Sequence, residues 1–124
     1  MITWNNLDTL EAFKNLSKAE RVNIAEAMSG ENGAERVKTY STPMAEGLAY
    51  NYAAKQVDDK VLEDLQKLAD EAQLTEKFEA LYNGEVINTG EKRMVLHHLT
   101  RGQLGEAVNA DGTDTVSYTH LRAH

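Results

Sequence analysis

The sequence predicts a mainly α-helical chain, built from several short amphipathic helices with one small hairpin near the C-terminus. Apolar side chains recur every three or four residues along most of its length, which is the spacing of a helix with one buried face. Glycine, asparagine, aspartate and a single proline interrupt this spacing, so the helices are expected to be short. An apolar run at 107–110 that ends in Asp111-Gly112 is typical of a strand entering a hairpin turn.

The N-terminal segment is expected to form two helices. The first covers about residues 7–16, where Leu7, Leu10, Phe13 and Leu16 recur at three-residue steps. Ser17 to Glu20 has the pattern of a capping box, in which the Ser17 hydroxyl accepts the backbone N–H of Glu20. The helix that this box opens carries Val22, Ile24, Ala25 and Met28, and it ends at Gly30.

The next part of the chain combines a short helix with irregular segments. A helix is expected at 33–39, and residues 41–43 (Ser-Thr-Pro) break the pattern after it. Residues 48–52 form either an extended segment or a helical turn. The tetrapeptide Ala-Glu-Arg-Val occurs at 19–22 and again at 34–37, but with no third copy it indicates coincidence and not a repeat architecture.

The strongest helical signal covers residues 57–72. Its apolar face consists of Val61, Leu62, Leu65, Leu68, Ala69 and Ala72, and Asp58 or Asp59 caps its positively polarised start. A shorter helix begins at Thr75, with Phe78, Leu81 and Tyr82 facing inward, and ends at Asn83-Gly84. A last helix is expected over about 91–101 and ends at Gly102.

Composition and charge exclude several kinds of function. The 124 residues fit about one domain, and a net charge of −7 disfavours nucleic acid and anionic membranes, because the summed field repels both. The absence of cysteine excludes disulfides and thiolate metal sites. The N-terminus lacks the features of a signal peptide, and no apolar run approaches the ~20 residues of a membrane-spanning helix. We therefore expect a soluble intracellular protein.

Residues 87–101 concentrate positive charge in this acidic chain. On a helix that turns about 100° per residue, Arg93, His97 and Arg101 share one face, opposite an apolar side. Such a face is either an anion site, since guanidinium groups bind carboxylate or phosphate, or a surface that pairs with neighbouring carboxylates. The adjacent residues His97 and His98 point about 100° apart on a helix, which disfavours a metal chelate.

Other signatures of catalysis are missing from the sequence. It contains no Gly-rich phosphate loop, no nucleophile elbow and no Ser/His/Asp arrangement. Tyr50 and Tyr52 fit either a ligand platform or half-buried packing. Taken alone, the residues predict a soluble helical domain without any catalytic, cofactor-binding or metal-ligating residue.

Taken together, residues 65–101 resemble the N-terminal region of the glucose-6-phosphate isomerase family. Ten positions match the family's motif in order: Gly84, Glu85, Ile87, Asn88, Glu91, Arg93, Val95, Leu96, His97 and Arg101. Residues 108–112 are similar to the family's Val-Asp-Gly turn, and 50–53 look more loosely like its Asp-Tyr-Ser segment. Departures at Thr89-Gly90, Met94 and Leu99-Thr100 indicate a divergent branch.

The resemblance implies a cytoplasmic, usually dimeric enzyme of glycolysis and gluconeogenesis. Such an enzyme interconverts glucose 6-phosphate and fructose 6-phosphate through a cis-enediol, without a metal or organic cofactor. The family has an α/β fold with two sugar-isomerase domains, and its catalytic groups lie in those later domains. We therefore assign no catalytic residue to this chain, and expect its partners to be the missing C-terminal domains, the sugar phosphate and a second subunit, with neither nucleic acid nor membrane.

The expected organisation is an incomplete N-terminal helical segment, 1–115, followed by a short tail, 116–124. The tail, VSYTHLRAH, resembles the in-frame translation of a transposase-type sequencing adapter, although a natural basic tail is the alternative. The alternative for the whole chain is a self-contained helical binding module, which uses the face of Arg93, His97 and Arg101 to hold an anionic partner. The fragment alone is expected to be inactive as an isomerase.

Overall fold

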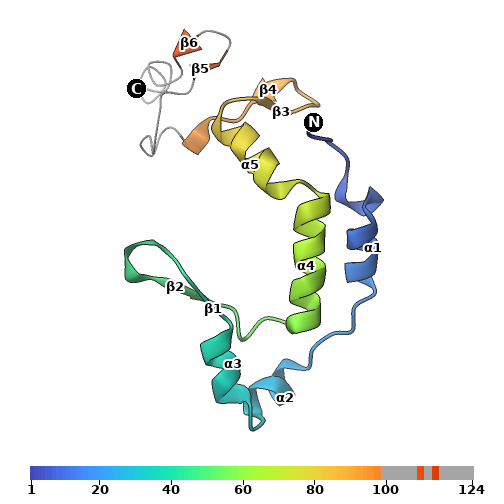
Figure 1. The fold of residues 1–124 in the computed structure, drawn as a ribbon, viewed down its shortest axis with the longest axis vertical. Helices are drawn as coiled ribbons and strands as arrows, with labels where there is room; N and C mark the ends of the chain where they lie inside the picture. Colours follow the sequence, from blue (N-terminus) through green and yellow to red (C-terminus); the bar gives the residue numbers. More distant parts are fainter. Residues whose placement is uncertain (99–108, 111–112, 115–124) are drawn as a thin grey trace. The chain divides into compact units, whose positions relative to one another are not determined.

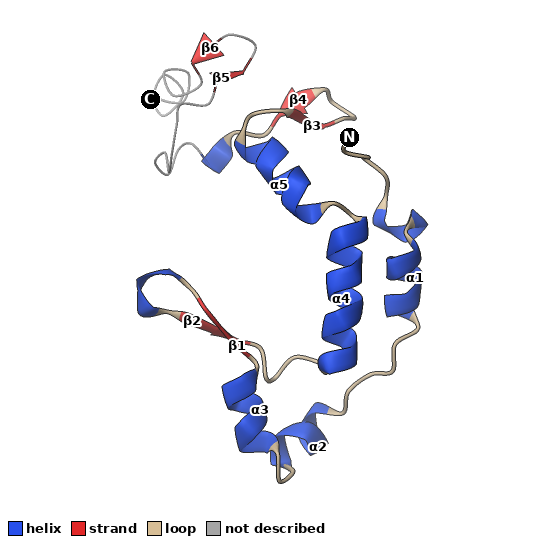
Figure 2. Cartoon of the chain, viewed as in Figure 1, coloured by secondary structure: helices blue, strands red, loops and turns tan. Residues whose placement is uncertain are grey.

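The computed structural model describes residues 1–98, and the backbone of 109–110 and 113–114, as a mainly helical chain (Figure 1, Figure 2). The chain divides into two units, one formed by residues 8–68 and the other by residues 1–7 together with 69–124. The predicted fold class is confirmed. None of the described helices is long and apolar enough to span a membrane.

The unit of residues 8–68 contains most of the helices. In chain order its elements are α1 (Glu11–Ser17), α2 (Ile24–Ser29), α3 (Gly33–Thr39), β1 (Ser41–Pro43), the 3-10 turn η2 (Ala45–Gly47), β2 (Ala49–Asn51) and most of α4 (Asp59–Glu71); a 3-10 turn, η1 (Leu7–Thr9), precedes α1. The amphipathic helix predicted over 7–16 is therefore confirmed as η1 and α1, and the helix at 33–39 is confirmed as α3.

The capping box predicted at Ser17 is wrong. Ser17 is the last residue of α1, and its Oγ donates to the Lys14 carbonyl oxygen at 2.7 Å. The next helix begins only at Ile24, where Asn23 Oδ1 accepts the backbone N–H of Glu26 at 3.3 Å. An asparagine is as good an N-cap as a serine, so the cap that lies directly before the apolar helical turn is the one used. The predicted end at Gly30 is confirmed.

The corner between α2 and α3 depends on a close backbone approach at Gly33. The Gly33 N–H donates to the Gly30 carbonyl oxygen at 3.0 Å, and a Cβ on Gly33 would overlap the Met28 carbonyl oxygen. A larger residue would therefore force the two helices apart at this corner.

Residues 41–51 form a two-stranded antiparallel hairpin, in which Thr42 pairs with Tyr50. The extended alternative for 48–52 is therefore the correct one. The connecting turn η2 contains two left-handed residues, Glu46 at φ 58° and Gly47 at φ 73°.

Helix α4 begins where the charge pattern predicts. Asp58 Oδ1 accepts the backbone N–H of Val61 at 2.8 Å, which confirms one of the two proposed caps. The predicted apolar face is half-buried or buried except at Leu65, which is 40% exposed, and Asp64 beside it is buried instead. Asp64 tolerates burial because it pairs with ammonium groups one turn away on the same helix.

The other unit contains α5 (Leu74–Tyr82), the antiparallel pair β3 (Val86–Asn88) and β4 (Arg93–Met94), and the antiparallel pair β5 (Asn109–Ala110) and β6 (Thr113–Asp114). Residues 109–110 pair with 113–114, which confirms the hairpin expected near the C-terminus. The helix predicted over 91–101 is wrong across 91–96, because residues 93–94 are a strand. Phe78, predicted to face inward, is 64% exposed.

The N-terminal residues are tied to the start of α5. Gln73, in a left-handed conformation, accepts hydrogen bonds at Oε1 from the backbone N–H and the hydroxyl of Thr3, at 2.8 and 3.0 Å. The Lys77 Nζ lies 5.5 Å from the centroid of the Trp4 ring. Trp4 therefore contacts a side chain of α5.

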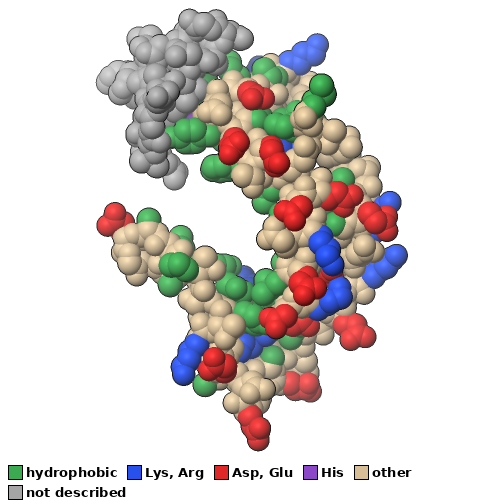
Figure 3. Space-filling view, in the orientation of Figure 1, with side chains coloured by type: hydrophobic (Ala, Val, Ile, Leu, Met, Phe, Trp, Pro, Cys, Tyr) green, Lys and Arg blue, Asp and Glu red, His purple; other side chains and the backbone are tan. Residues whose placement is uncertain are grey.

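Few side chains are fully covered in the part of the chain that the structure describes. The buried apolar residues are Ala12, Tyr40, Ala53, Ala72 and Ala80, and four of these five are alanines. Many large apolar side chains lie on the surface instead, and Figure 3 shows them as green areas on the visible face. Small residues bury little apolar area, so this core contributes modestly to stability.

Candidate functional site

The segment that carries the ten motif positions begins with a Schellman-type end to α5. Gly84 has φ 77°, and the backbone N–H groups of Gly84 and Glu85 donate to the carbonyl oxygens of Leu81 and Ala80, at 3.2 and 2.9 Å. These bonds satisfy carbonyls that the helix leaves open, and they require a residue that tolerates positive φ after Asn83. Gly84 and Glu85 therefore act here through their backbone.

Asn88 and Glu91 hold the turn between β3 and β4. Asn88 Oδ1 accepts the Glu91 backbone N–H at 3.2 Å, and Asn88 Nδ2 donates to the Glu91 carboxylate at 3.2 Å. The first of these bonds could also cap a helix. Lys92, however, has φ 52°, which takes the chain out of the helical path, and Arg93 then pairs with Asn88 across the hairpin. This turn replaces the start of the predicted helix.

The predicted cationic helix face is therefore not formed by the residues that the structure describes. Arg93 lies in β4 with an exposed side chain, and it makes no ion pair with another described residue. His97, also exposed, has 3-10 backbone geometry and already has an interaction partner. Arg101 lies outside the described residues. Val95 and Leu96, two further motif positions, are half-buried, as is Ile87 in β3.

The structure separates the two adjacent histidines. His98 stacks on Tyr82 with ring centroids 4.9 Å apart, and its Nε2 lies 3.2 Å from the Tyr82 carbonyl oxygen. When Nε2 carries the proton and donates, Nδ1 is an acceptor, and it is buried without a partner among residues 1–98. Within the described ranges no group of three or more His, Cys, Asp or Glu side chains could hold a metal ion.

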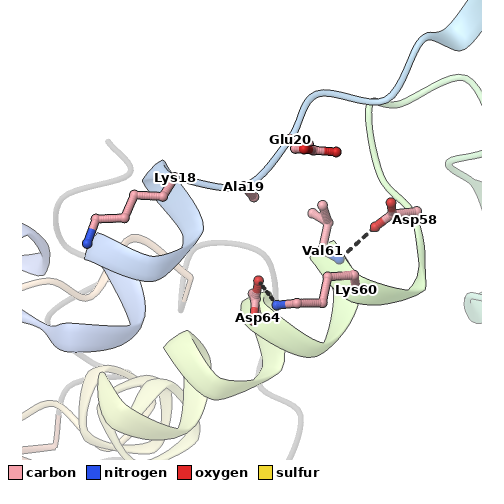
Figure 4. Close-up of a pocket in the computed structure, with 7 residues that line it drawn as sticks. All are labelled: Lys18, Ala19, Glu20, Asp58, Lys60, Val61 and Asp64. Atoms are coloured by element: carbon pink, nitrogen blue, oxygen red, sulfur yellow. Dashed lines mark hydrogen bonds and ion pairs between the residues drawn. The ribbon is translucent and has the colours of Figure 1, made fainter.

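A shallow hollow lies beside the start of α4 (Figure 4). Its lining residues are Lys18, Ala19, Glu20, Asp58, Lys60, Val61 and Asp64. Lys60 Nζ donates to Asp64 Oδ2 at 2.7 Å, and this bond raises the pKa of Lys60 above its usual value. Lys67 lies 3.9 Å from the other oxygen of Asp64, and Asp58 caps α4. Lys60, Asp64 and Asp58 are therefore engaged in contacts of α4 itself.

Arg36, on α3, holds the chain that leads into α4. Its Nε donates to the Ala53 carbonyl oxygen at 2.8 Å, and its Nη2 donates to those of Lys55 and Val57, at 3.0 and 2.6 Å. Its guanidinium carbon also lies 4.5 Å from the centroid of the Tyr40 ring. A planar guanidinium can make these bonds at once, since its donors point in fixed, divergent directions. We call this set of contacts the Arg36 clamp.

The Arg36 clamp was not predicted from the sequence, although one local pattern indicates it. Arg36 belongs to the second Ala-Glu-Arg-Val copy, which lies in α3, whereas Arg21 of the first copy lies in an irregular segment. The two copies therefore have different structures, and the reading of the repeat as coincidence agrees with them. That local pattern is an arginine followed four residues later by a tyrosine at the C-terminal end of the same helix.

Three tyrosines stack next to the Arg36 clamp. The rings of Tyr40 and Tyr52 lie 5.3 Å apart, and those of Tyr50 and Tyr52 lie 6.0 Å apart. Tyr40 Oη donates to Asp59 Oδ1 at 3.0 Å. Burial, together with this bond to the carboxylate, raises the pKa of Tyr40 above 10.0. Tyr52 is therefore half-buried between two other rings, as the packing alternative predicts, while Tyr50 is 51% exposed.

Comparison with known proteins gives a consistent family. A family model described as phosphoglucose isomerase matches residues 51–122. The glucose-6-phosphate isomerase of Treponema denticola is 50% identical over 120 residues, covering 93% of this chain and 23% of that protein. The glucose-6-phosphate isomerase of Treponema pallidum subsp. pallidum is 46% identical over 100 residues, which cover 81% of this chain and 19% of that protein. The glucose-6-phosphate isomerase of Borreliella afzelii is 40% identical over 117 residues, which cover 94% of this chain and 21% of that protein. The chain spans about a fifth of the length of these curated relatives.

Proposed function

Because the chain belongs to the phosphoglucose isomerase family, we propose that it is the N-terminal part of a glucose-6-phosphate isomerase. The whole enzyme would interconvert glucose 6-phosphate and fructose 6-phosphate through a cis-enediol. The observation that carries this proposal is the 50% identity to the Treponema denticola glucose-6-phosphate isomerase along 93% of the chain. Identity at this level, spread over so much of the chain, is far more specific than any single motif.

In this proposal the described residues build a scaffold, and the chemistry belongs to the remainder of the longer protein. The reaction needs a carboxylate base, an acid–base group at the ring oxygen and a cradle for the phosphate. Support comes from the contacts of the motif positions: Gly84 and Glu85 end a helix, and Asn88 and Glu91 hold a turn. The ten motif positions are accordingly proposed as structural positions of the family.

The remaining properties follow from the same proposal. The partners of the whole protein would be its sugar phosphate substrate and a second subunit, and it would work in the cytoplasm, in glycolysis and gluconeogenesis. No metal or organic cofactor would take part. The absence of a membrane-spanning helix among the described residues is compatible with this location.

We further propose that residues 1–115 are native and that the tail, 116–124, derives from a sequencing adapter. The family match extends to residue 122 and so includes most of the tail as family sequence, whereas the adapter resemblance makes the tail foreign to the protein. Sequencing the native locus decides between them. The proposal predicts that codons for VSYTHLRAH are absent after Thr115, and finding them in genomic DNA would refute it.

The alternative, a self-contained module that holds an anionic partner, loses its structural basis over the described residues. That alternative required Arg93 and His97 on one helical face, and Arg93 lies in a strand. No contact among the described residues favours it over the isomerase.

The decisive experiment is an isomerase assay on the full-length protein, expressed from the completed gene. Production of glucose 6-phosphate from fructose 6-phosphate is followed through a coupled dehydrogenase. We expect turnover by the full-length protein and none by the 124-residue chain. A folded full-length protein without turnover would refute the proposed function, and turnover by the 124-residue chain would refute the assignment of chemistry to the rest of the protein.

A further inference from the structure

The hairpin of β1 and β2 is unusual for a solvent-exposed element. Every residue of both strands is exposed, as are the residues between them. A lone two-stranded hairpin is marginally stable in water and normally needs a third strand or a covering element. Edge strands that remain in solvent usually carry charges, particularly lysine. Residues 41–51 contain a single charged side chain, Glu46 at the turn.

Three large apolar side chains of this hairpin are exposed, two beside the turn and one on β2. Met44 is 58% exposed, Leu48 65% and Tyr50 51%. The Met44 N–H donates to the Leu48 carbonyl oxygen at 2.7 Å, so these two residues face each other across the turn. We call these three exposed side chains, Met44, Leu48 and Tyr50, the apolar tip.

Hydrogen bonds and ring stacking at the base of the hairpin fix it to the end of α3. Asn51 Nδ2 donates to the Val37 carbonyl oxygen at 2.7 Å, and the Tyr52 N–H donates to that of Tyr40 at 2.9 Å. The stack of Tyr50 on Tyr52 continues into Tyr40, which the Arg36 clamp contacts. The hairpin is therefore anchored on α3, and the tip is presented in a defined conformation before any partner covers it. Pre-organisation of this kind lowers the entropic cost of docking.

We infer that the apolar tip docks on the remainder of the same, longer polypeptide, as a fixed contact between this segment and the part that follows it. The inference rests on the proposed function. The chain spans 23% of the Treponema denticola relative, so most of the surface available in such a protein belongs to that remainder. A covalently attached surface also has a high effective concentration, which favours it over a second copy.

Site-specific photo-cross-linking in the full-length protein tests the inference. Leu48 is replaced by p-benzoylphenylalanine, and Tyr50, which is closer in shape to the probe, is replaced in a second variant. The control carries the probe at Glu31, an exposed residue between α2 and α3. Cross-linked peptides are identified by mass spectrometry, and a mixture of isotope-labelled and unlabelled protein separates links within one chain from links between chains.

We expect both hairpin probes to link to residues beyond position 124 of the same chain, and the Glu31 probe to give at least about tenfold less product, because reaction requires sustained contact. Links between chains, links confined to residues 1–124, or the absence of links at both hairpin positions would each overturn the inference. Isomerase turnover of each variant is measured in parallel. An active enzyme with an uncovered tip refutes the docking alone, whereas a folded, inactive full-length protein without any probe refutes the proposed function.

Discussion

At the residue scale, Arg36 makes three side-chain hydrogen bonds and a cation–π contact with Tyr40. Its guanidinium group donates hydrogen bonds to the carbonyl oxygens of Ala53, Lys55 and Val57, which lie outside the hydrogen-bonding patterns of helices and strands. Buried carbonyl groups without a partner are costly, and hydrogen bonds to a charged donor are stronger than neutral ones. The conformation of the segment that leads into α4 therefore depends on this one side chain.

Replacing Arg36→Ala should lower the free energy of unfolding by about 2 kcal/mol, since three charge-assisted bonds are lost and a buried carbonyl remains unpaired. Thermal unfolding followed by circular dichroism measures the change. Arg21→Ala is the matched control, because Arg21 stands in the same tetrapeptide but in an irregular, exposed segment. An equal loss of stability in both variants would contradict the Arg36 clamp.

Tyr40 gives the chain a pH dependence at alkaline pH. Its pKa is raised above 10.0 in the folded state by burial and by the bond to Asp59. A raised folded-state pKa contributes stability that is complete below pH 10.0 and is lost as pH rises through the folded pKa, because the unfolded chain releases the proton first.

The free energy of unfolding should therefore fall as pH rises above 10.0, and Tyr40→Phe should remove this part of the decline. At neutral pH the variant should lose about 1 kcal/mol with the hydrogen bond to Asp59. Unfolding curves at a series of pH values measure both effects. Parallel pH profiles for the two proteins would show that another group is responsible.

At the element scale, the beginning of α2 shows which of two possible caps operates. Asn23→Ala should lower the free energy of unfolding by about 1 kcal/mol, because the Glu26 N–H loses its acceptor at the N-terminus of the helix. Ser17→Ala should change it by no more than about 0.5 kcal/mol, since Ser17 is exposed at the end of α1. Chemical unfolding of the two variants compares them directly, and the reverse order would restore the capping box that the sequence suggested.

Three further elements depend on local signals that act within a few residues. Gly30 and Gly84 end helices where the sequence predicts, and Asp58 starts one. Such signals are reliable because the residues that interact at a helix end lie within a few positions of one another in the sequence.

At the scale of the whole molecule, the exposed apolar surface should control the behaviour of the isolated 124-residue chain. In the part of the chain that the structure describes, the buried apolar residues are mostly alanines, while Leu48, Leu74 and Phe78 are each at least 60% exposed. We expect the purified chain to self-associate, and its thermal transition to be broad and concentration-dependent, because apolar patches without a cover promote association. Sedimentation velocity at several concentrations measures this. A clean monomer with a sharp, concentration-independent transition would contradict it.

The sequence by itself determined the family and most of the helices. Ten ordered positions between Gly84 and Arg101 led to the isomerase family, which the family match and the curated relatives confirm. The apolar periodicity of 57–72 and the boundaries of 33–39 were sufficient for α4 and α3. Both kinds of signal can be read along the chain, because each depends on residue type at short, fixed spacing.

Only the tertiary structure decided how those positions are used. Residues 91–96 have helical periodicity, yet Lys92 adopts a left-handed conformation and Arg93 pairs with Asn88 in a hairpin that a helix would exclude. Arg36 reaches carbonyls 17 to 21 residues away, and spacing along the chain does not reveal contacts at that separation. Asp64 is buried while Leu65 is exposed, because burial depends on what packs against a helix and periodicity describes only the helix itself.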